Sequence, residues 1–310
     1  MNKSIAEEKM KQLSYRIDPQ SKLLYSHELK GGVSAQVTML EVEYPDGHKK
    51  KMIIRQHGEI DIKRNPKIAL DEFTLLKSLH SFGLPTPEPY YLESSGEIFT
   101  TPCIVMEYIE GETQFKPACL SDYILQLAAN LAKIHSIDYS KIDLSFLPNQ
   151  ENMYTEKMRN RPPVLDESLS EGRIRDTIEL VWPVVQQNSS TILHGDFWPG
   201  NLLWKEDQLV GIIDWEDVAF GDPLADVANS RLEILWHFGI HAMNDFTAQY
   251  QSIMPTVNFE NLPYWDLCAA LRPTSKITTW GLDEITLKRM KKRHHLFVNQ
   301  AIKKILSSNV

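Results

Sequence analysis

Three side chains near the middle of the chain have the chemistry needed to transfer a phosphoryl group. Asp196, Asn201 and Asp214 occur in one stretch that reads ILHGDFWPGNLLW and then GIIDW. A carboxylate within reach of an attacking hydroxyl can accept its proton. Carboxylate and amide oxygens are hard ligands of the kind that Mg²⁺ prefers, and metal ions neutralise charge on a transferred phosphoryl group. The spacing therefore indicates Asp196 as a base and Asn201 and Asp214 as metal ligands.

Short apolar runs around these residues predict the elements that must position them. Residues 191–193 are β-branched or apolar and predict a buried strand that leads into the turn containing Asp196. Two further apolar runs, 202–204 and 209–213, flank a polar turn and predict a hairpin that ends at Asp214. A single Asp or Asn often only shapes a turn, so the assignment needs all three residues together.

The motif HGDFWPGN, followed by IDWED and GDPLAD, resembles the aminoglycoside phosphotransferase and choline kinase-like family of small-molecule kinases. The resemblance implies an α+β, bilobal protein kinase-like fold. An antiparallel sheet lobe at 1–109 would bind the nucleotide, and a mostly helical lobe at 110–310 would hold the catalytic loop and the acceptor site. ATP would lie between the lobes as co-substrate, with Mg²⁺ as cofactor. The phosphate acceptor would be a hydroxyl of a small molecule.

Two positions depart from the more distant protein kinase pattern. Gly195 stands where protein kinases have an arginine that responds to activation-loop phosphorylation. Trp215-Glu216 follow Asp214, where protein kinases have Phe-Gly. No segment resembling Ala-Pro-Glu with a phosphorylation site follows. These departures favour a small-molecule kinase over a protein kinase.

The first hundred residues contain the parts that the resemblance assigns to nucleotide binding. Apolar runs at 23–29, 35–44 and 51–55 predict three strands. Glycines in a turn let backbone N–H groups approach phosphates closely, because no side chain intervenes. The resemblance implies this phosphate-binding role for the turn that contains Gly31, Gly32 and Ser34.

A cation on the third strand would hold the α- and β-phosphates. Arg55 fits this position, where relatives usually have lysine, and Lys51 at the start of the strand is the competing assignment. The resemblance implies that Glu72 pairs with this cation, from a predicted helix at 68–82. One apolar face of that helix is predicted from Leu70, Phe73, Leu76 and Leu79, which places Glu72 on another face.

The crossover between the lobes binds adenine in relatives through backbone groups. By position, these are the Glu107 carbonyl and the Ile109 N–H. In the second lobe, apolar spacing predicts an amphipathic helix from residue 120 to His135. We interpret His135 and His194 as structural and Asp226 as a brace for backbone near the catalytic loop.

The acceptor side is less regular in sequence. Residues 145–171 predict a loop or lid, and 169–185 predict a helix. The basic run at 288–293 interrupts an apolar helical stripe, which indicates a solvated helix face. In relatives, later residues face the acceptor site, and core packing is the alternative role for the tryptophans among them. The corresponding residues here are Trp236, Trp265, Arg272 and Trp280.

Composition agrees with a cytoplasmic enzyme. The 310 residues are 42% hydrophobic and 24% charged, which is ordinary for a globular protein. Three well-separated cysteines do not predict a disulfide framework. The start of the chain has no apolar signal region, and no apolar run is long enough for a membrane span. A net charge of −8 disfavours nucleic acid as a partner.

Two alternatives and several details stay open at the level of sequence. The chain could be a nucleotide-binding pseudokinase, or, against the departures above, a protein kinase. The acceptor could be an aminoglycoside, a choline-like amino alcohol, a sugar, a macrolide or another hydroxyl metabolite. Sequence does not choose between ATP and GTP, and it does not give the oligomeric state.

Overall fold

The computed structural model describes residues 3–29 and 35–308. The predicted phosphate-binding turn with Gly31, Gly32 and Ser34 therefore lies outside the described residues. Contacts divide the chain into two compact units. The first contains the residues up to Gly111 together with Val210–Ile213, and the second contains Glu112–Leu209 and Asp214–Val310. Asp214 is thus the residue at which the chain re-enters the second unit.

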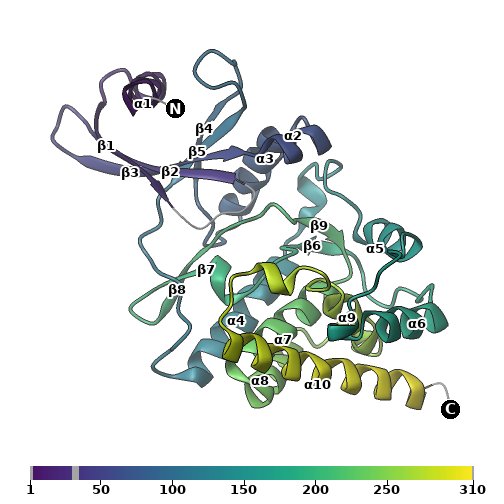
Figure 1. The fold of residues 1–310 in the computed structure, drawn as a ribbon. Helices are drawn as coiled ribbons and strands as arrows, with labels where there is room; N and C mark the ends of the chain where they lie inside the picture. Colours follow the sequence, from purple (N-terminus) through teal and green to yellow (C-terminus); the bar gives the residue numbers. More distant parts are fainter. Residues whose placement is uncertain (1–2, 30–34, 309–310) are drawn as a thin grey trace. The chain divides into compact units, whose positions relative to one another are not determined.

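The first unit is built on a five-stranded antiparallel sheet with the order β1-β2-β3-β5-β4 (Figure 1). Alternating side chains divide between its two faces, as the period of a strand requires. Leu40, Met52 and Val105 lie on the face that packs against Met10 and Leu13 of α1. The elements in chain order are α1 (Lys3–Ile17), β1 (Lys22–Leu29), β2 (Ala35–Glu43), β3 (Lys49–His57), α2 (Glu59–Arg64), α3 (Ile68–Ser81), β4 (Pro89–Glu93) and β5 (Cys103–Glu107).

Helix α3 contacts strands β3, β4 and β5, and it corrects one prediction. The buried residues of α3 are Ala69, Glu72, Leu75, Leu76 and Leu79. Leu70 is 47% exposed, so the predicted apolar face was set wrongly. Glu72 lies on the buried face, because two basic residues of β3 meet its carboxylate there. The ends of the helix agree with the prediction.

The second unit is mainly helical and carries the small ribbon of β6 with β9. Strand β7, which pairs with β8, also belongs to it, whereas residues 210–212 of β8 belong to the first unit. The α+β fold with an antiparallel N-terminal sheet and a helical C-terminal region is therefore confirmed. Its helices are α4 (Leu120–His135), α5 (Gln150–Arg159), α6 (Glu171–Val181), α7 (Leu224–Phe238), α8 (Ile240–Ile253), α9 (Leu262–Ala270) and α10 (Glu284–Ser308). The strands are β6 (Thr191–Leu193), β7 (Leu202–Lys205), β8 (Gln208–Ile212) and β9 (Ala219–Gly221).

The segment predicted as a loop or lid, 145–171, instead contains helix α5. Asn149 caps this helix by accepting a hydrogen bond from the N–H of Asn152 at 3.0 Å. Its sequence is mostly polar, and Met158 is the one buried apolar residue of the helix. Apolar periodicity therefore gave no signal, whereas the cap could have. The next helix, α6, is also shorter than the predicted 169–185.

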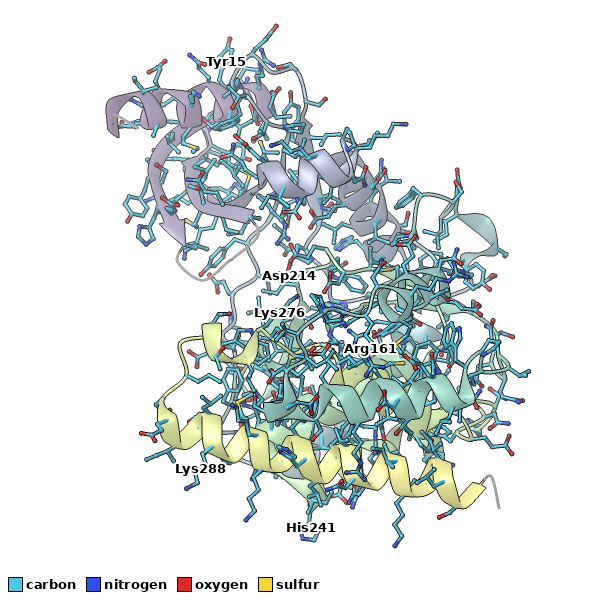
Figure 2. The ribbon with its side chains drawn as sticks, turned by 45° about the vertical axis from the view of Figure 1, so that its right-hand side comes forward. Tyr15, Arg161, Asp214, His241, Lys276 and Lys288 are labelled. Carbon is cyan, nitrogen blue, oxygen red and sulfur yellow. The ribbon has the colours of Figure 1, made fainter. Side chains whose placement is uncertain are left out.

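The last helix confirms the solvated-face interpretation. Met290, His294, Phe297 and Ala301 are buried along one stripe of α10. Lys288 lies on the outer side of the helix (Figure 2). Among the described residues, no helix is long and apolar enough to cross a membrane.

Candidate active site

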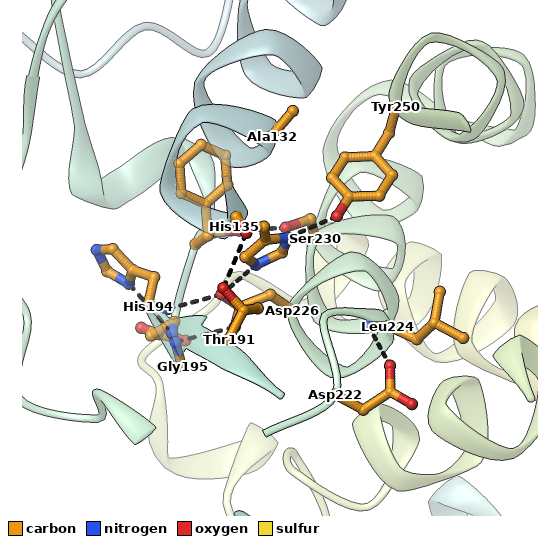
Figure 3. Close-up of polar contacts among 12 residues, drawn as sticks. Ala132, His135, Thr191, His194, Gly195, Asp222, Leu224, Asp226, Ser230 and Tyr250 are labelled. Atoms are coloured by element: carbon orange, nitrogen blue, oxygen red, sulfur yellow. Dashed lines mark hydrogen bonds and ion pairs between the residues drawn. The ribbon is translucent and has the colours of Figure 1, made fainter. Parts of the chain in front are cut away.

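A buried carboxylate holds the backbone of the turn formed by His194, Gly195 and Asp196, called the HGD turn below. Asp226, on α7, accepts hydrogen bonds from the N–H groups of His194 at 2.6 Å and Gly195 at 2.9 Å (Figure 3). The same carboxylate lies 3.3 Å from Nε2 of His135, whose Nδ1 lies 2.6 Å from the hydroxyl of Tyr250. The predicted bracing role of Asp226 is confirmed, and so is the structural role of His135 at the end of α4.

Burial and pairing have opposite effects on Asp226. Burial raises the pKa of a carboxyl group, but the hydrogen bond and charge of His135 outweigh it, so the pKa of Asp226 lies below its usual value. The group is therefore an anion that binds the positive ends of backbone dipoles. Such charge-assisted hydrogen bonds are stronger than neutral ones.

Gly195 is required by the shape of the turn. Its φ of +81° is strained for residues with a side chain, and a Cβ at this position would lie 1.9 Å from the carbonyl oxygen of Asp217. The close approach explains why an arginine, found here in protein kinases, does not fit. His194 is fully buried, and its Nδ1 accepts from the N–H of Asp196 at 3.2 Å.

The turn sets the side chains of Asp196 and Asn201 against each other. The amide nitrogen of Asn201 donates to the backbone oxygen of Asp196 at 3.0 Å and to its Oδ2 at 3.1 Å. Asn201 closes a short 3-10 turn, Pro199–Asn201, immediately before β7. Since the amide nitrogen is directed at Asp196, the amide oxygen is the group of Asn201 that can bind a cation.

Arg272 binds the other oxygen of the candidate base. Its Nη2 lies 2.8 Å from Oδ1 of Asp196 and 3.3 Å from Oδ2 of Asp217, and its Nη1 donates to the carbonyl of Gly195 at 2.7 Å. Arg272 follows α9, far along the chain from the catalytic loop. Asp196 therefore has one fixed partner on each carboxylate oxygen.

The electrostatics of Asp196 suit a proton acceptor. Burial raises the pKa of its carboxyl group, Arg272 opposes this rise, and the nearby negative charges of Asp217 and Asp214 add to it. The net shift is upward. A base is most effective when its pKa approaches the working pH, so a raised carboxyl pKa favours this role.

Asp214 lies where β8 has ended, in a left-handed conformation with φ of 67°. Its charge acts on Asp196, which places the two carboxylates in one electrostatic environment. Among residues 3–29 and 35–308, no cluster of three or more His, Cys, Asp or Glu side chains could hold a metal. A site made of Asp214, the Asn201 amide oxygen, waters and substrate phosphates fits Mg²⁺, which usually keeps several non-protein ligands.

A second charged cluster lies within the first unit. Oε1 of Glu72 lies 3.4 Å from Nε of Arg55, and its Oε2 lies 2.8 Å from Nε2 of His57. Arg55 and His57 alternate with the apolar Ile54 along β3, so both side chains point to the face that α3 covers. Burial raises the pKa of Glu72, but Arg55 and His57 outweigh it and hold the pKa below its usual value.

The remaining predicted nucleotide contacts are backbone groups. Glu107 is the last residue of β5, paired with Met52 of β3, and Ile109 follows in a segment without regular structure. Lys51, the alternative cation, is exposed and lies 4.0 Å from Glu110. Its place at the surface of β3 favours Arg55 as the buried cation.

Three contacts of the candidate site were not predicted from the sequence, although the resemblance placed Arg272 itself on the acceptor side. His57 follows Arg55 with the period of a strand, so alternation on β3 could have suggested it. Arg272 and Asp217 are brought to Asp196 by tertiary packing, for which no local pattern exists.

Two of the tryptophans named on the acceptor side pack against other parts of the second unit. Trp236 is 1% exposed, and Trp265 packs against Tyr154 with ring centroids 5.6 Å apart.

The chain belongs to the phosphotransferase enzyme family (APH), whose model matches residues 30–258. The fold agrees with solved members of that group. A putative aminoglycoside phosphotransferase from Ralstonia eutropha JMP134 aligns with a TM-score of 0.68 and 14% identity, over 97% of this chain and 98% of that chain. Amicoumacin kinase hAmiN, solved with AMP-PNP, Ca²⁺ and Ami, aligns with a TM-score of 0.61 and 13% identity, over 97% and 96% of the two chains.

The curated proteins that are similar in sequence are named as acyl-CoA dehydrogenase family members, not as phosphotransferases. Acyl-CoA dehydrogenase family member 11 of Rattus norvegicus is 26% identical over 238 residues, which are 64% of this chain and 29% of that protein. Family member 10 of Mus musculus is 28% identical over 177 residues, which are 52% of this chain and 16% of that protein. The chain thus spans less than a third of the length of these relatives.

Proposed function

We propose that the protein transfers the γ-phosphate of a nucleoside triphosphate, expected to be ATP, to a hydroxyl group of a small molecule. The observation that carries this proposal is the arrangement of Asp196, with one oxygen bound by Arg272 and the other by the amide of Asn201. Membership of a phosphotransferase family supports it. A pseudokinase has no reason to keep all three of Asp196, Asn201 and Asp214.

Each residue has a separate task in this proposal. Asp196 orients the acceptor hydroxyl and accepts its proton as the oxygen attacks the γ-phosphorus. Asn201 and Asp214 would hold Mg²⁺, which when bound would neutralise phosphate charge. Arg55, oriented by Glu72, would bind nucleotide phosphates in the first unit, and positioning with charge neutralisation would provide most of the rate enhancement.

The test is phosphate transfer measured as a gain in acceptor mass. Purified protein is incubated with Mg²⁺ and either ATP or GTP, because solved neighbours include complexes with AMP-PNP and with GDP. The acceptor panel contains aminoglycosides, amino alcohols, sugars and hydroxy acids. It also contains hydroxyacyl-CoA thioesters, because curated relatives are named acyl-CoA dehydrogenases. A product with one nucleotide and one acceptor class supports the proposal, and hydrolysis without any product contradicts it.

A further inference from the structure

A partly buried lysine of the second unit has no carboxylate as an ion-pair partner among the described residues. Lys157, on α5, is partly buried, and its Nζ lies 3.4 Å from the carbonyl oxygen of Leu271. No described carboxylate lies within ion-pair distance of this ammonium group. Leu271 directly precedes Arg272, so Lys157 and the guanidinium that binds Asp196 lie on the same part of the second unit.

Other cations surround Lys157. Burial lowers the pKa of Lys157 to about 8, and the like charges of Arg272, Lys276 and Arg175 add to this effect. Lys276 lies in the loop that follows α9 and is exposed (Figure 2). Arg175 is already paired with Glu171 at 2.9 Å. A charged group is costly to bury without a partner, so this arrangement favours an anionic ligand.

Asp166 accepts a hydrogen bond from the N–H of Ser275 at 3.0 Å, which brings one carboxylate next to Lys276. The acidic groups near Arg272 add little free negative charge. Asp196 and Asp217 are both held by Arg272. Glu233 on α7 is also close to Asp196, but burial and the charge of Asp196 raise its pKa to about 8, so it is mostly neutral at pH 7. Lys157 and Lys276 therefore lie close to Arg272, and Arg272 binds the Asp196 carboxylate that an acceptor hydroxyl must reach.

We propose that Lys157 and Lys276, beside Arg272, bind an anionic group of the phosphate acceptor. The inference rests on the proposed function and narrows its substrate class. The bound group is a carboxylate or a phosphate, carried by the same molecule that presents its hydroxyl to Asp196. A polycationic acceptor such as an aminoglycoside would instead meet like charges, which disfavour its binding.

Binding is tested without turnover, in the Asp196→Asn protein. Lysines are acetylated with limiting acetic anhydride at pH 8, and labelling is measured by mass spectrometry. Malate, inorganic phosphate and glucose 6-phosphate are the anionic probes, and malamide and glucose are their neutral controls. We expect the anions to reduce labelling of Lys157 several-fold and to leave the exposed Lys133 of α4 unchanged.

Several outcomes would overturn the inference. One is equal labelling of Lys157 with all three anions and with the neutral controls. Another is protection by Mg²⁺ and AMP-PNP alone, which would assign the cations to the nucleotide phosphates. Because these readouts need no transfer, they separate the inference from the proposed function.

Kinetics provide the second arm once the acceptor panel has identified a substrate. Lys157→Met should raise KM for an anionic acceptor at least about tenfold with little change in kcat, since a hydrogen bond to a charged group is lost. Lys157→Arg should retain most of the affinity, and Lys133→Met is the matched control. Preferential transfer to neutral or cationic acceptors would contradict the inference while the proposed function stands.

Discussion

Nη2 of Arg272 lies 2.8 Å from Oδ1 of Asp196, and Nη1 of the same guanidinium donates to the carbonyl of Gly195 at 2.7 Å. One side chain from the end of α9 therefore fixes both the carboxylate and the backbone of the catalytic turn. A guanidinium does this better than an ammonium group, because its donors form a planar fork. Its charge also opposes the rise in the pKa of Asp196 that burial causes.

Replacing Arg272 should shift the pH dependence of transfer. In Arg272→Met, burial is no longer opposed, so the pKa of Asp196 rises further and the acidic limb of kcat moves to higher pH. Transfer at neutral pH should fall by about ten- to a hundredfold, because the base is also less well positioned. Arg272→Lys keeps the charge and should shift the limb less. A pH profile of Arg272→Met that matches the wild type would contradict this role.

The turn at Gly195 should not tolerate a side chain. Gly195→Ala places a Cβ against the Asp217 carbonyl in addition to requiring a left-handed backbone. The matched control is Gly47→Ala, which has the same φ of +81° but nothing within 4 Å of the added Cβ. We expect Gly47→Ala to cost about 1–2 kcal/mol. Gly195→Ala should cost more and remove transfer activity, as measured by denaturant unfolding and the transfer assay. Equal stabilities of the two variants would contradict the predicted steric conflict.

Asp226 should stabilise the second unit in a pH-dependent way. Its pKa is below the usual 3.8 in the folded protein, so its contribution is present above about pH 4 and is lost as the pH falls through the lower folded value. Asp226→Ala should reduce the free energy of unfolding by about 3–5 kcal/mol at pH 7, because the partners of a buried charge are left unpaired. The difference from wild type should shrink as the pH is lowered. A difference that stays constant down to pH 3 would show that the charge is not responsible.

The Glu72 carboxylate should be needed for both folding and nucleotide affinity in the first unit. Glu72→Gln removes the charge that pairs with Arg55 and His57, so the free energy of unfolding should fall and nucleotide should bind more weakly. Because the folded pKa of Glu72 is lowered, the stabilising effect is present above about 4.5 and is lost in more acidic solution. The control is Glu59→Gln, since Glu59 is exposed. Nucleotide affinity that is the same in both variants would exclude Glu72 from nucleotide binding.

Local patterns predicted much of the fold, and tertiary contacts explain the rest. Strands β2 and β3 follow from the apolar runs at 35–44 and 51–55. The predicted buried face of α3 was wrong because apolar residues occur on two sides of that helix, one with Leu70 and one with Ala69 and Leu75. The pairing of Glu72 with β3 decides which side is buried. Helix α5 escaped prediction because it buries little apolar surface.

The candidate site likewise contains residues that local patterns predicted and residues that only tertiary contacts bring together. The HGD turn was readable because its motif is contiguous, and its brace, Asp226, belongs to a second contiguous motif. Arg272 and Lys157 come from separate elements that meet only in the folded chain. The contact of Arg272 with Asp196 and the contact of Lys157 with the carbonyl of Leu271 both depend on tertiary packing, which a single sequence does not encode in any local pattern.

The central claim is that Asp196 accepts the proton of the acceptor hydroxyl during phosphate transfer. The direct test compares wild type with Asp196→Asn, using the acceptor found in the panel and mass gain as the readout, with nucleotide binding measured in parallel. The account predicts loss of nearly all transfer in Asp196→Asn, by about a thousandfold or more, with nucleotide affinity retained. Transfer at a rate close to wild type would contradict the assignment of Asp196 as the base.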